Sequence, residues 1–265
     1  MQESASVLSP AQSNRSSDKL LSMLEVLSEQ SEPLHLQGIS QLCNVNPSTA
    51  LRFLSSLRRR NYVAQTADTG KYYLTFKICS LAQSVHLFSD MRNVALPYLR
   101  NAAHLFSESC SLAIDSDMTA MYIEVVPGPN KQFLSLHRIG SSAPLHCTAV
   151  GKLLLATYSP ERVERLIATR GLEARTEHTI TDPDALESEL ESVRKRGYAL
   201  DDQECEYGTR CLAVPIRDHT GKICAAIGVS GPSVRMTDEL IFSKLTCFIE
   251  TAEQISFRLG WTGRA

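Results

Sequence analysis

The residues best suited to chemistry in the first third of the chain lie on one face of a helix predicted over Pro47–Asn61. At about 100° per residue, hydroxyl and guanidinium side chains fall opposite an apolar stripe, with Thr49 at the edge of that face. The side chains on this polar face are those of Ser48, Arg52, Ser55 and Arg59. Short hydroxyls reach phosphates and base edges, and arginine pairs with guanine through two hydrogen bonds. Such a face suits insertion into a DNA groove.

Positive charge is concentrated around this helix. Residues 45–75 contain five basic residues and one acidic residue, whereas the net charge of the whole chain is −2. The basic residues are Arg52, Arg58, Arg59, Arg60 and Lys71. A local basic patch is the electrostatic footprint of nucleic-acid binding. The alternative is a domain that contacts only proteins, with its arginines as a solvated surface.

Three short helices and a hairpin would position this face. Apolar residues spaced by three and four predict a helix from Ser17, and a second helix is predicted over Leu36–Cys43. Asn46 and the proline after it are a strong helix start, because asparagine caps the first turn and proline fits it. Two β-prone runs, 62–65 and 71–74, predict a hairpin. This order predicts a winged helix-turn-helix with Lys71 in its wing.

Three later segments could hold a small ligand. Residues 147–151 would open a helix, whose free amides and dipole attract an anion. Three of the four residues 201–204 are acidic, and this segment follows a predicted helix. Residues 230–232 end a predicted strand with a hydroxyl and free amides. Periodicity does not show that the three converge, so three ordinary turns are the alternative.

Enzyme signatures are incomplete. Residues 148–152 end in Gly-Lys like a phosphate loop, but His146 and Leu153 stand where a glycine and a Ser/Thr are needed. The run Gly228–Pro232 starts like a nucleophile elbow and lacks its second glycine. The eight cysteines form no C-x-x-C pair, and isolated His and Cys residues are mostly structural. We therefore expect no catalytic residues, no metal site and no cofactor.

Length and composition set the frame. A chain of 265 residues predicts two domains at about 150 residues each. No apolar run reaches the length of a transmembrane helix, and the N-terminus lacks a secretion signal, so a cytoplasmic protein without membrane contact is expected. In the second domain strands are predicted over 111–116, 120–126, 133–139, 210–217 and 222–230, and helices over 148–158, 160–169, 182–197 and 237–259. Strands joined by short loops with helices around them indicate an antiparallel α+β fold.

The chain resembles the IclR family of bacterial transcriptional regulators. The winged-helix segment, residues 33–78, is similar to the family's N-terminal domain. The segments PLHCTAVGKLLLA, RGYALDDQE, G-x-RCLAVPI and VSGP match its effector domain in order and spacing. The resemblance covers residues 17–259. It implies an N-terminal winged helix-turn-helix, a linker helix and a C-terminal GAF-like antiparallel sheet with helices.

We expect a disordered tail over 1–16, the DNA-binding domain over 17–75, a linker and dimerisation helix over 76–90, and the effector-binding domain over 91–265. The resemblance implies a homodimer or homotetramer on double-stranded operator DNA. The predicted DNA-binding residues are Ser48, Thr49, Arg52, Ser55, Arg59 and Lys71. Pro47 stands where relatives often have lysine, which predicts one phosphate contact fewer.

The resemblance also implies an effector pocket formed by Ala149, Val150, Asp201, Cys211 and Ser230. The predicted effector of this repressor of a catabolic operon is a small carboxylate, with a sugar acid as one candidate and an aromatic acid, sensed by an activator, as the alternative. Gly228 stands where some relatives place a second ligand-binding serine, so we expect extra space and a larger ligand there. A thiol or metal sensor using Cys147, Cys205 or Cys211 is the third hypothesis.

Overall fold

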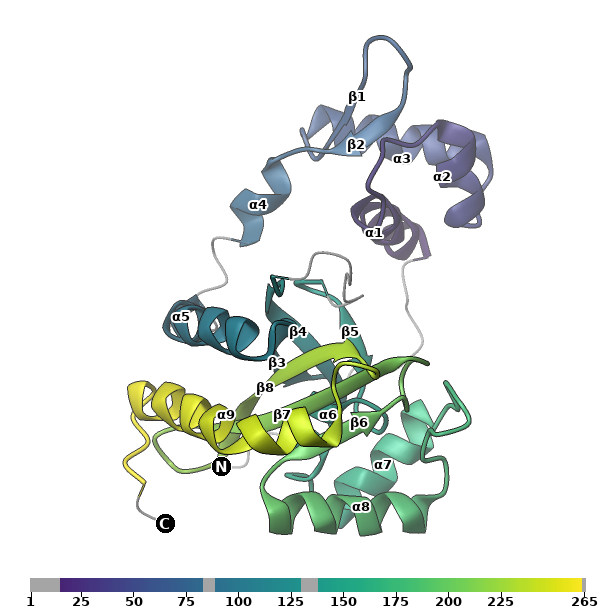
Figure 1. Cartoon of the computed structure of the whole chain (residues 1–265). Coiled ribbons are helices and arrows are strands. Elements are labelled where there is room, and N and C mark those ends of the chain that lie inside the picture. The colour runs from purple at the N-terminus through teal and green to yellow at the C-terminus, as the bar shows by residue number, and fades with distance from the viewer. Residues whose placement is uncertain (1–14, 83–88, 130–137, 264–265) are drawn as a thin grey trace, which may run out of the picture. The chain divides into compact units, whose positions relative to one another are not determined.

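Figure 1 shows the computed structural model of the chain, which describes residues 15–82, 89–129 and 138–263. The chain divides into two compact units, residues 1–86 and 87–265. Each unit has its own apolar core, which is the physical basis for folding as a domain. The predicted α+β fold class, with a helix-turn-helix followed by an antiparallel sheet, is confirmed.

The N-terminal unit is a winged helix-turn-helix. Its helices are α1 (Arg15–Ser28), α2 (Leu36–Leu42) and α3 (Pro47–Arg59), and its hairpin pairs β1 (Val63–Gln65) with β2 (Tyr72–Leu74) in antiparallel register. Met23, Ile39 and Leu54 are fully buried between the helices. The first helix begins at Arg15, inside the predicted tail. The pattern in the sequence starts later because the first turn of the helix contains no apolar residue. Residues 1–14 lie outside the described residues.

The predicted linker helix is described only in part. Helix α4 spans Lys77–Ala82 and residues 83–88 lie outside the described residues. Helix α5 (Ser89–Phe106) contains Pro97, where the sequence predicts a kink or restart. The helix continues across the proline. Ala95 and Leu99 are fully buried on either side of it, so tertiary packing offsets the hydrogen bond that proline cannot make.

The C-terminal unit is built on a six-stranded antiparallel sheet in the order β5-β4-β3-β8-β7-β6. The strands are β3 (Ser109–Ser116), β4 (Thr119–Val126), β5 (Ser142–Pro144), β6 (Ala199–Asp202), β7 (Thr209–Arg217) and β8 (Ile223–Pro232). The sequence did not predict β5 and β6, because strands of three and four residues are too short for a period-2 pattern. Of the strand predicted over 133–139, residues 133–137 lie outside the described residues, and Arg138 and Ile139 are not in a strand.

Helices cover both faces of this sheet (Figure 1). Helices α5 and α9 (Asp238–Arg258) pack on one face. Helices α6 (Ala149–Leu155), α7 (Pro160–Arg170) and α8 (Pro183–Arg196) pack on the other. Alternation along β3 supplies both cores, since Leu112 faces the first layer and Ala113 the second. The second layer matters for function, because α6 lies against the middle of the sheet.

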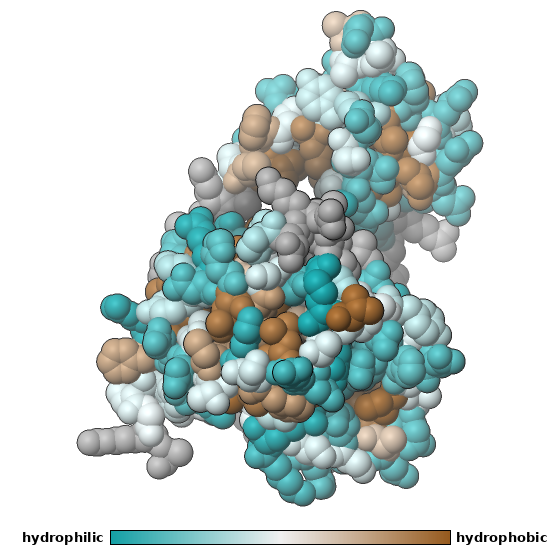
Figure 2. Space-filling view, viewed as in Figure 1, coloured by the Kyte–Doolittle hydropathy of each residue, from teal (hydrophilic) through white to brown (hydrophobic). Residues whose placement is uncertain are grey.

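Apolar side chains also remain on the surface, where Figure 2 shows small brown groups among teal polar residues on the visible face. Phe76 is 89% exposed, Val234 is 82% exposed and Phe257 is 67% exposed. Single exposed apolar side chains of this kind are common on protein surfaces. Within the described ranges, no helix is both long enough and apolar enough to cross a bilayer.

Candidate functional site

The start of α3 is fixed by its cap. The side chain of Asn46 accepts a hydrogen bond from the Thr49 amide at 3.0 Å, and the Ser48 hydroxyl donates to the same oxygen at 3.1 Å. Pro47 occupies the first helical position, as predicted. The cap therefore holds Ser48 and Thr49 in the first turn, at the end of the helix where backbone amides are free.

An open groove runs along the exposed side of α3. It is lined by Ser48, Leu51, Arg52, Ser55, Ser56 and Arg59. Four of the six predicted DNA-binding residues therefore share one surface, whereas Thr49 is half-buried beside it and Lys71 lies in the wing. The sequence predicts an α3 face with no apolar residue, and this prediction is wrong, because Leu51 is 46% exposed in the groove. At about 100° per residue Leu51 lies only about 60° from Ser48 around the helix, which places it at the edge of the polar face.

The wing is attached to α3 through Gln65. The Arg58 guanidinium donates to the Gln65 side chain at 2.7 Å, and the Gln65 amide donates to the carbonyl of Gly70 at 2.7 Å. Gly70 has φ +66°, the conformation that the turn needs and that glycine adopts without strain. Arg58 thus hydrogen-bonds inside the domain, whereas Arg52 and Arg59 are exposed in the groove, with the Arg52 guanidinium 5.4 Å from the centre of the Phe53 ring.

The C-terminal unit contains a small cavity between the sheet and α6. Nine residues line it: Ser111, Tyr122, Thr148, Ala149, Val150, Asp201, Cys211, Gly228 and Ser230. All five residues predicted for an effector pocket are among them. The sequence reasoning did not select Ser111 and Tyr122 as site residues. The sequence feature that points to these two residues is a polar group on the inward face of a buried strand, where an aliphatic residue is usual.

Strand register brings the predicted residues together. Asp201 in β6 lies opposite Cys211 in β7, and Cys211 lies opposite Ser230 in β8. Because directly paired residues share a face of the sheet, all three side chains point toward α6. The Cys211 thiol hydrogen-bonds with the side chains of Asp201 and Ser230. Asp201 follows α8 as predicted, but it lies in the short strand β6, which the sequence does not reveal.

The other wall of the cavity is the beginning of α6. The Thr148 hydroxyl accepts from the Gly151 amide at 3.1 Å and donates to the carbonyl of Pro144 at 2.8 Å. A Cβ on Gly151 would lie 2.7 Å from the carbonyl oxygen of Leu145, so only glycine allows this close approach. The helix start is thereby held against the sheet, with Ala149 and Val150 at its first two positions.

The space expected beside Gly228 is absent, and this expectation is wrong. A Cβ on Gly228 would lie 2.7 Å from Cγ1 of Val150, which already fills the position. The volume open to a water-sized molecule is about 10 Å³, close to the room that one water needs. A ligand larger than this requires Val150 and the first turn of α6 to move.

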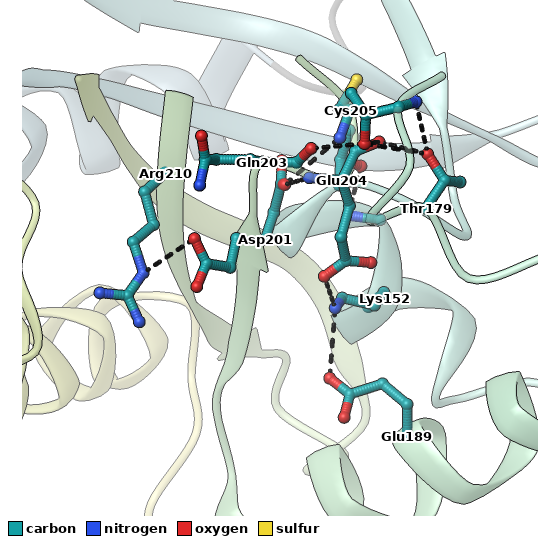
Figure 3. A network of polar contacts seen from close by, with 12 residues as sticks. Lys152, Thr179, Glu189, Asp201, Gln203, Glu204, Cys205 and Arg210 are labelled. Carbon is teal, nitrogen blue, oxygen red and sulfur yellow. Dashed lines mark hydrogen bonds and ion pairs between the residues drawn. The ribbon is translucent and has the colours of Figure 1, made fainter. Parts of the chain in front are cut away.

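Asp201 dominates the electrostatics of the cavity. Its Oδ1 accepts from the amides of Glu204 at 2.8 Å and Cys205 at 3.4 Å (Figure 3). Burial, together with the negative charge of Glu204, raises the pKa of Asp201 to about 7, against the effect of these hydrogen bonds and of Lys152. Lysine, arginine and histidine are not among the nine lining residues. The described cavity lining therefore contains one acidic side chain and no basic one.

Two further thiols lie close to this group. The Cys147 and Cys205 side chains hydrogen-bond to each other, which lowers the pKa of Cys205 and raises that of Cys147. Both are free thiols. In the ranges that the structure describes, no cluster of three His, Cys, Asp or Glu residues could hold a metal ion.

Comparisons with known proteins agree for both units. Residues 83–257 match the family described as bacterial transcriptional regulator IclR C-terminal, and residues 16–67 match the IclR helix-turn-helix domain. The chain is similar to the HTH-type transcriptional regulator KdgR of Escherichia coli (strain K12), with 32% identity over 244 residues, 92% of each chain. It is also similar to the transcriptional repressor IclR of that organism, with 30% identity over 91% of this chain and 88% of the relative.

Among solved structures, an IclR homolog complexed with 4-hydroxybenzoate from Microbacterium hydrocarbonoxydans has a TM-score of 0.79 to this chain. The match covers 92% of this chain and 98% of the other at 23% sequence identity. At this identity the likeness concerns the fold.

Proposed function

Because the chain belongs to the IclR family of bacterial transcriptional regulators, we propose that it represses a catabolic operon and that a small carboxylate controls its binding to the operator. Control by a small ligand is supported by the convergence of three separate segments of the chain on one cavity. The protein acts by binding and not by turnover, and it works in the bacterial cytoplasm, where operator DNA lies.

The DNA contacts are assigned to the groove of α3 and to the wing. Arg52 and Arg59 are exposed guanidinium groups suited to guanine or phosphate, and Lys71 adds a phosphate contact from the wing. Ser48, Thr49 and Ser55 supply short hydroxyls. Leu51 adds an apolar group that suits the methyl group of thymine. One winged helix covers too little DNA for tight specific binding, so a homodimer or homotetramer reads a pseudo-palindromic operator.

The effector is assigned to the cavity of the C-terminal unit. The amides of Ala149 and Val150 receive its carboxylate, and Ser230 and Asp201 hydrogen-bond to its hydroxyl groups. Cys211 contributes the floor between them. Since Val150 fills the cavity, ligand entry moves the first turn of α6 away from β8. This movement is the step by which the effector changes the protein.

An aromatic acid is the second candidate effector, and the structural relative that binds 4-hydroxybenzoate supports it. The Tyr122 ring in the cavity offers a surface on which an aromatic ligand could pack. A thiol sensor is the third candidate, favoured by the hydrogen bond between Cys147 and Cys205. Under that hypothesis a Cys205→Ser variant loses its response to peroxide, whereas its response to carboxylates is retained.

Calorimetry with gluconate, pyruvate and 4-hydroxybenzoate tests the carboxylate assignment, with release of DNA from the promoter region of the chain's own gene as the functional readout. Ser230→Ala is expected to weaken binding of the active acid by about 1 kcal/mol, because a hydroxyl partner is lost. Ser188→Ala, an exposed serine on α8, is the matched control. Binding unchanged by both Ser230→Ala and Cys211→Leu places the ligand elsewhere.

A further inference from the structure

A buried ion pair lies directly behind the effector cavity. Lys152 on α6 is 2% exposed, and its Nζ lies 2.5 Å from Oε1 of Glu204 and 3.2 Å from Oε1 of Glu189 (Figure 3). Glu189 is also paired with Arg196 at 2.8 Å. Two cations thus face two carboxylates, and this part of the interior is balanced in charge.

Asp201 is an acidic group outside this balanced set of two cations and two carboxylates. It is 2% exposed, and within residues 15–82, 89–129 and 138–263 no lysine or arginine forms an ion pair with it. Its connection to the ion pair runs through Glu204, whose amide donates to Asp201 and whose carboxylate accepts from Lys152. The carbonyl of Glu204 is held from the other side by the Thr179 hydroxyl at 2.6 Å. The distance between Asp201 and the Glu204 charge is therefore fixed.

The remaining titratable groups around Asp201 carry no permanent positive charge. They are the thiols of Cys147, Cys205 and Cys211 and the phenol of Tyr122. Arg175, from the segment between α7 and α8, acts on Cys147 and Cys205. An anionic ligand in this cavity therefore meets a buried carboxylate with no lysine, arginine or histidine in the lining. Two like charges so close in a buried site cannot both stay ionised.

On the premise that the effector is a carboxylate, we propose that it binds together with one proton held by Asp201, and that the Lys152–Glu204 pair sets the pH at which Asp201 takes up this proton. Lys152 and Glu204 are then positioning residues of the effector site. The directions of their effects on the pKa of Asp201 agree, since the charge of Glu204 raises it and that of Lys152 lowers it.

Calorimetry of gluconate, pyruvate and 4-hydroxybenzoate in phosphate and Tris buffers counts the protons taken up. At about pH 8 binding should take up roughly one proton, and at about pH 6 much less, because Asp201 is then already protonated. Affinity should be level at acidic pH and fall about tenfold per pH unit above the midpoint. Asp201→Asn should abolish both effects, and Asp202→Asn, at the exposed neighbouring position, should abolish neither.

Two variants test the role of the ion pair with opposite expected shifts. Glu204→Gln removes a negative charge and keeps Lys152, so the midpoint should move to lower pH. Lys152→Met removes the positive charge, so the midpoint should move to higher pH. A purely structural role would lower the affinity at all pH values and leave the midpoint in place. Cys205→Ser, which removes the thiol whose pKa is lowered, should keep the wild-type midpoint.

A measurement without ligand separates this inference from the proposed effector class. The difference in unfolding free energy between each protein and its Asp201→Asn counterpart, followed against pH, gives the midpoint of Asp201 directly. If this midpoint moves as expected but none of the three acids binds, the carboxylate effector is overturned and the control of Asp201 by the ion pair is supported. Binding without proton uptake at about pH 8, or equal midpoints in both variants, would overturn the inference. If Lys152→Met does not fold, the shift of the Asp201 midpoint in the isosteric variant Glu204→Gln tests the inference alone.

Discussion

Val150 occupies the position that a side chain at residue 228 would take, since a Cβ on Gly228 would lie 2.7 Å from its Cγ1 atom. The first turn of α6 therefore rests directly on strand β8. This contact limits the size of the cavity, because the Val150 side chain fills the space beside Gly228 between α6 and β8. The geometry couples ligand size to the position of α6.

Gly228→Ala should displace α6 and destabilise the C-terminal unit by about 1–3 kcal/mol, because valine is stiff and cannot rotate out of the overlap. The additional substitution Val150→Ala should restore most of this loss. Urea denaturation measures both changes. Gly38→Ala is the control, since nothing lies within 4 Å of a Cβ there. Additive effects of the two substitutions, without rescue, would show that the contact is unimportant.

Arg52→Ala should abolish discrimination between operator and random DNA while the protein stays folded. The loss of a bidentate base contact costs about 1–3 kcal/mol for the specific site. Arg60→Ala, at the exposed end of the helix and outside the groove, should lower the affinities for operator and random DNA by the same factor. Fluorescence anisotropy at fixed salt gives the ratio of the two affinities. An unchanged ratio in Arg52→Ala would remove this helix from base recognition.

Gln65→Ala should release the wing from α3, because both Arg58 and Gly70 lose their partner. Amide exchange in β1 and β2 should accelerate, and the salt dependence of DNA binding should decrease by about one phosphate contact as Lys71 becomes disordered. Gln41→Ala, an exposed glutamine on α2, is the control. Wild-type exchange in the hairpin of Gln65→Ala would show that β-pairing alone holds the wing.

The stability of the protein should depend on pH through Asp201. Its pKa is about 7 in the folded protein and about 4 in an unfolded chain, so the folded state binds the proton more tightly. The stability that this contributes is present below about pH 4 and is lost as the pH rises through 7, by on the order of 4 kcal/mol at most. Asp201→Asn keeps an acceptor for both amides and should not show this loss. Urea denaturation at about pH 5.5 and 8.5 compares the two proteins, and parallel pH profiles would contradict the assignment.

The protein should be a dimer or tetramer at micromolar concentration. The spacing of Ile78, Leu81, Ala82 and Val85 by three and four residues predicts an apolar dimerisation stripe, of which Val85 lies outside the described residues. Leu81 is 53% exposed within its own unit, which leaves it available for a partner chain. Leu81→Glu should shift light scattering toward the monomer and weaken operator binding, whereas Leu42→Glu, at an equally exposed leucine on α2, should not. A wild-type monomer with and without DNA would refute the prediction.

The winged helix-turn-helix and the α+β class can be predicted from the sequence alone. The Asn46 cap, the spacing of apolar residues along α3 and the turn before β2 are local signals, and each acts within a few residues of where it is read. The same signals located the exposed face with Ser48, Arg52, Ser55 and Arg59. Helical periodicity is enough to predict such a face, because it does not depend on distant contacts. The exposure of Leu51 at the edge of the face is the exception.

The construction of the cavity in the C-terminal unit depends on three-dimensional packing. Asp201, Cys211 and Ser230 meet through strand register, and the edge strand β6 that carries Asp201 is too short to show a pattern in the sequence. The overlap of Val150 with position 228 and the pairing of Lys152 with Glu204 join residues that are 78 and 52 positions apart. Contacts between such distant residues depend on how the sheet and α6 pack in three dimensions, and periodicity and propensity carry no information about them.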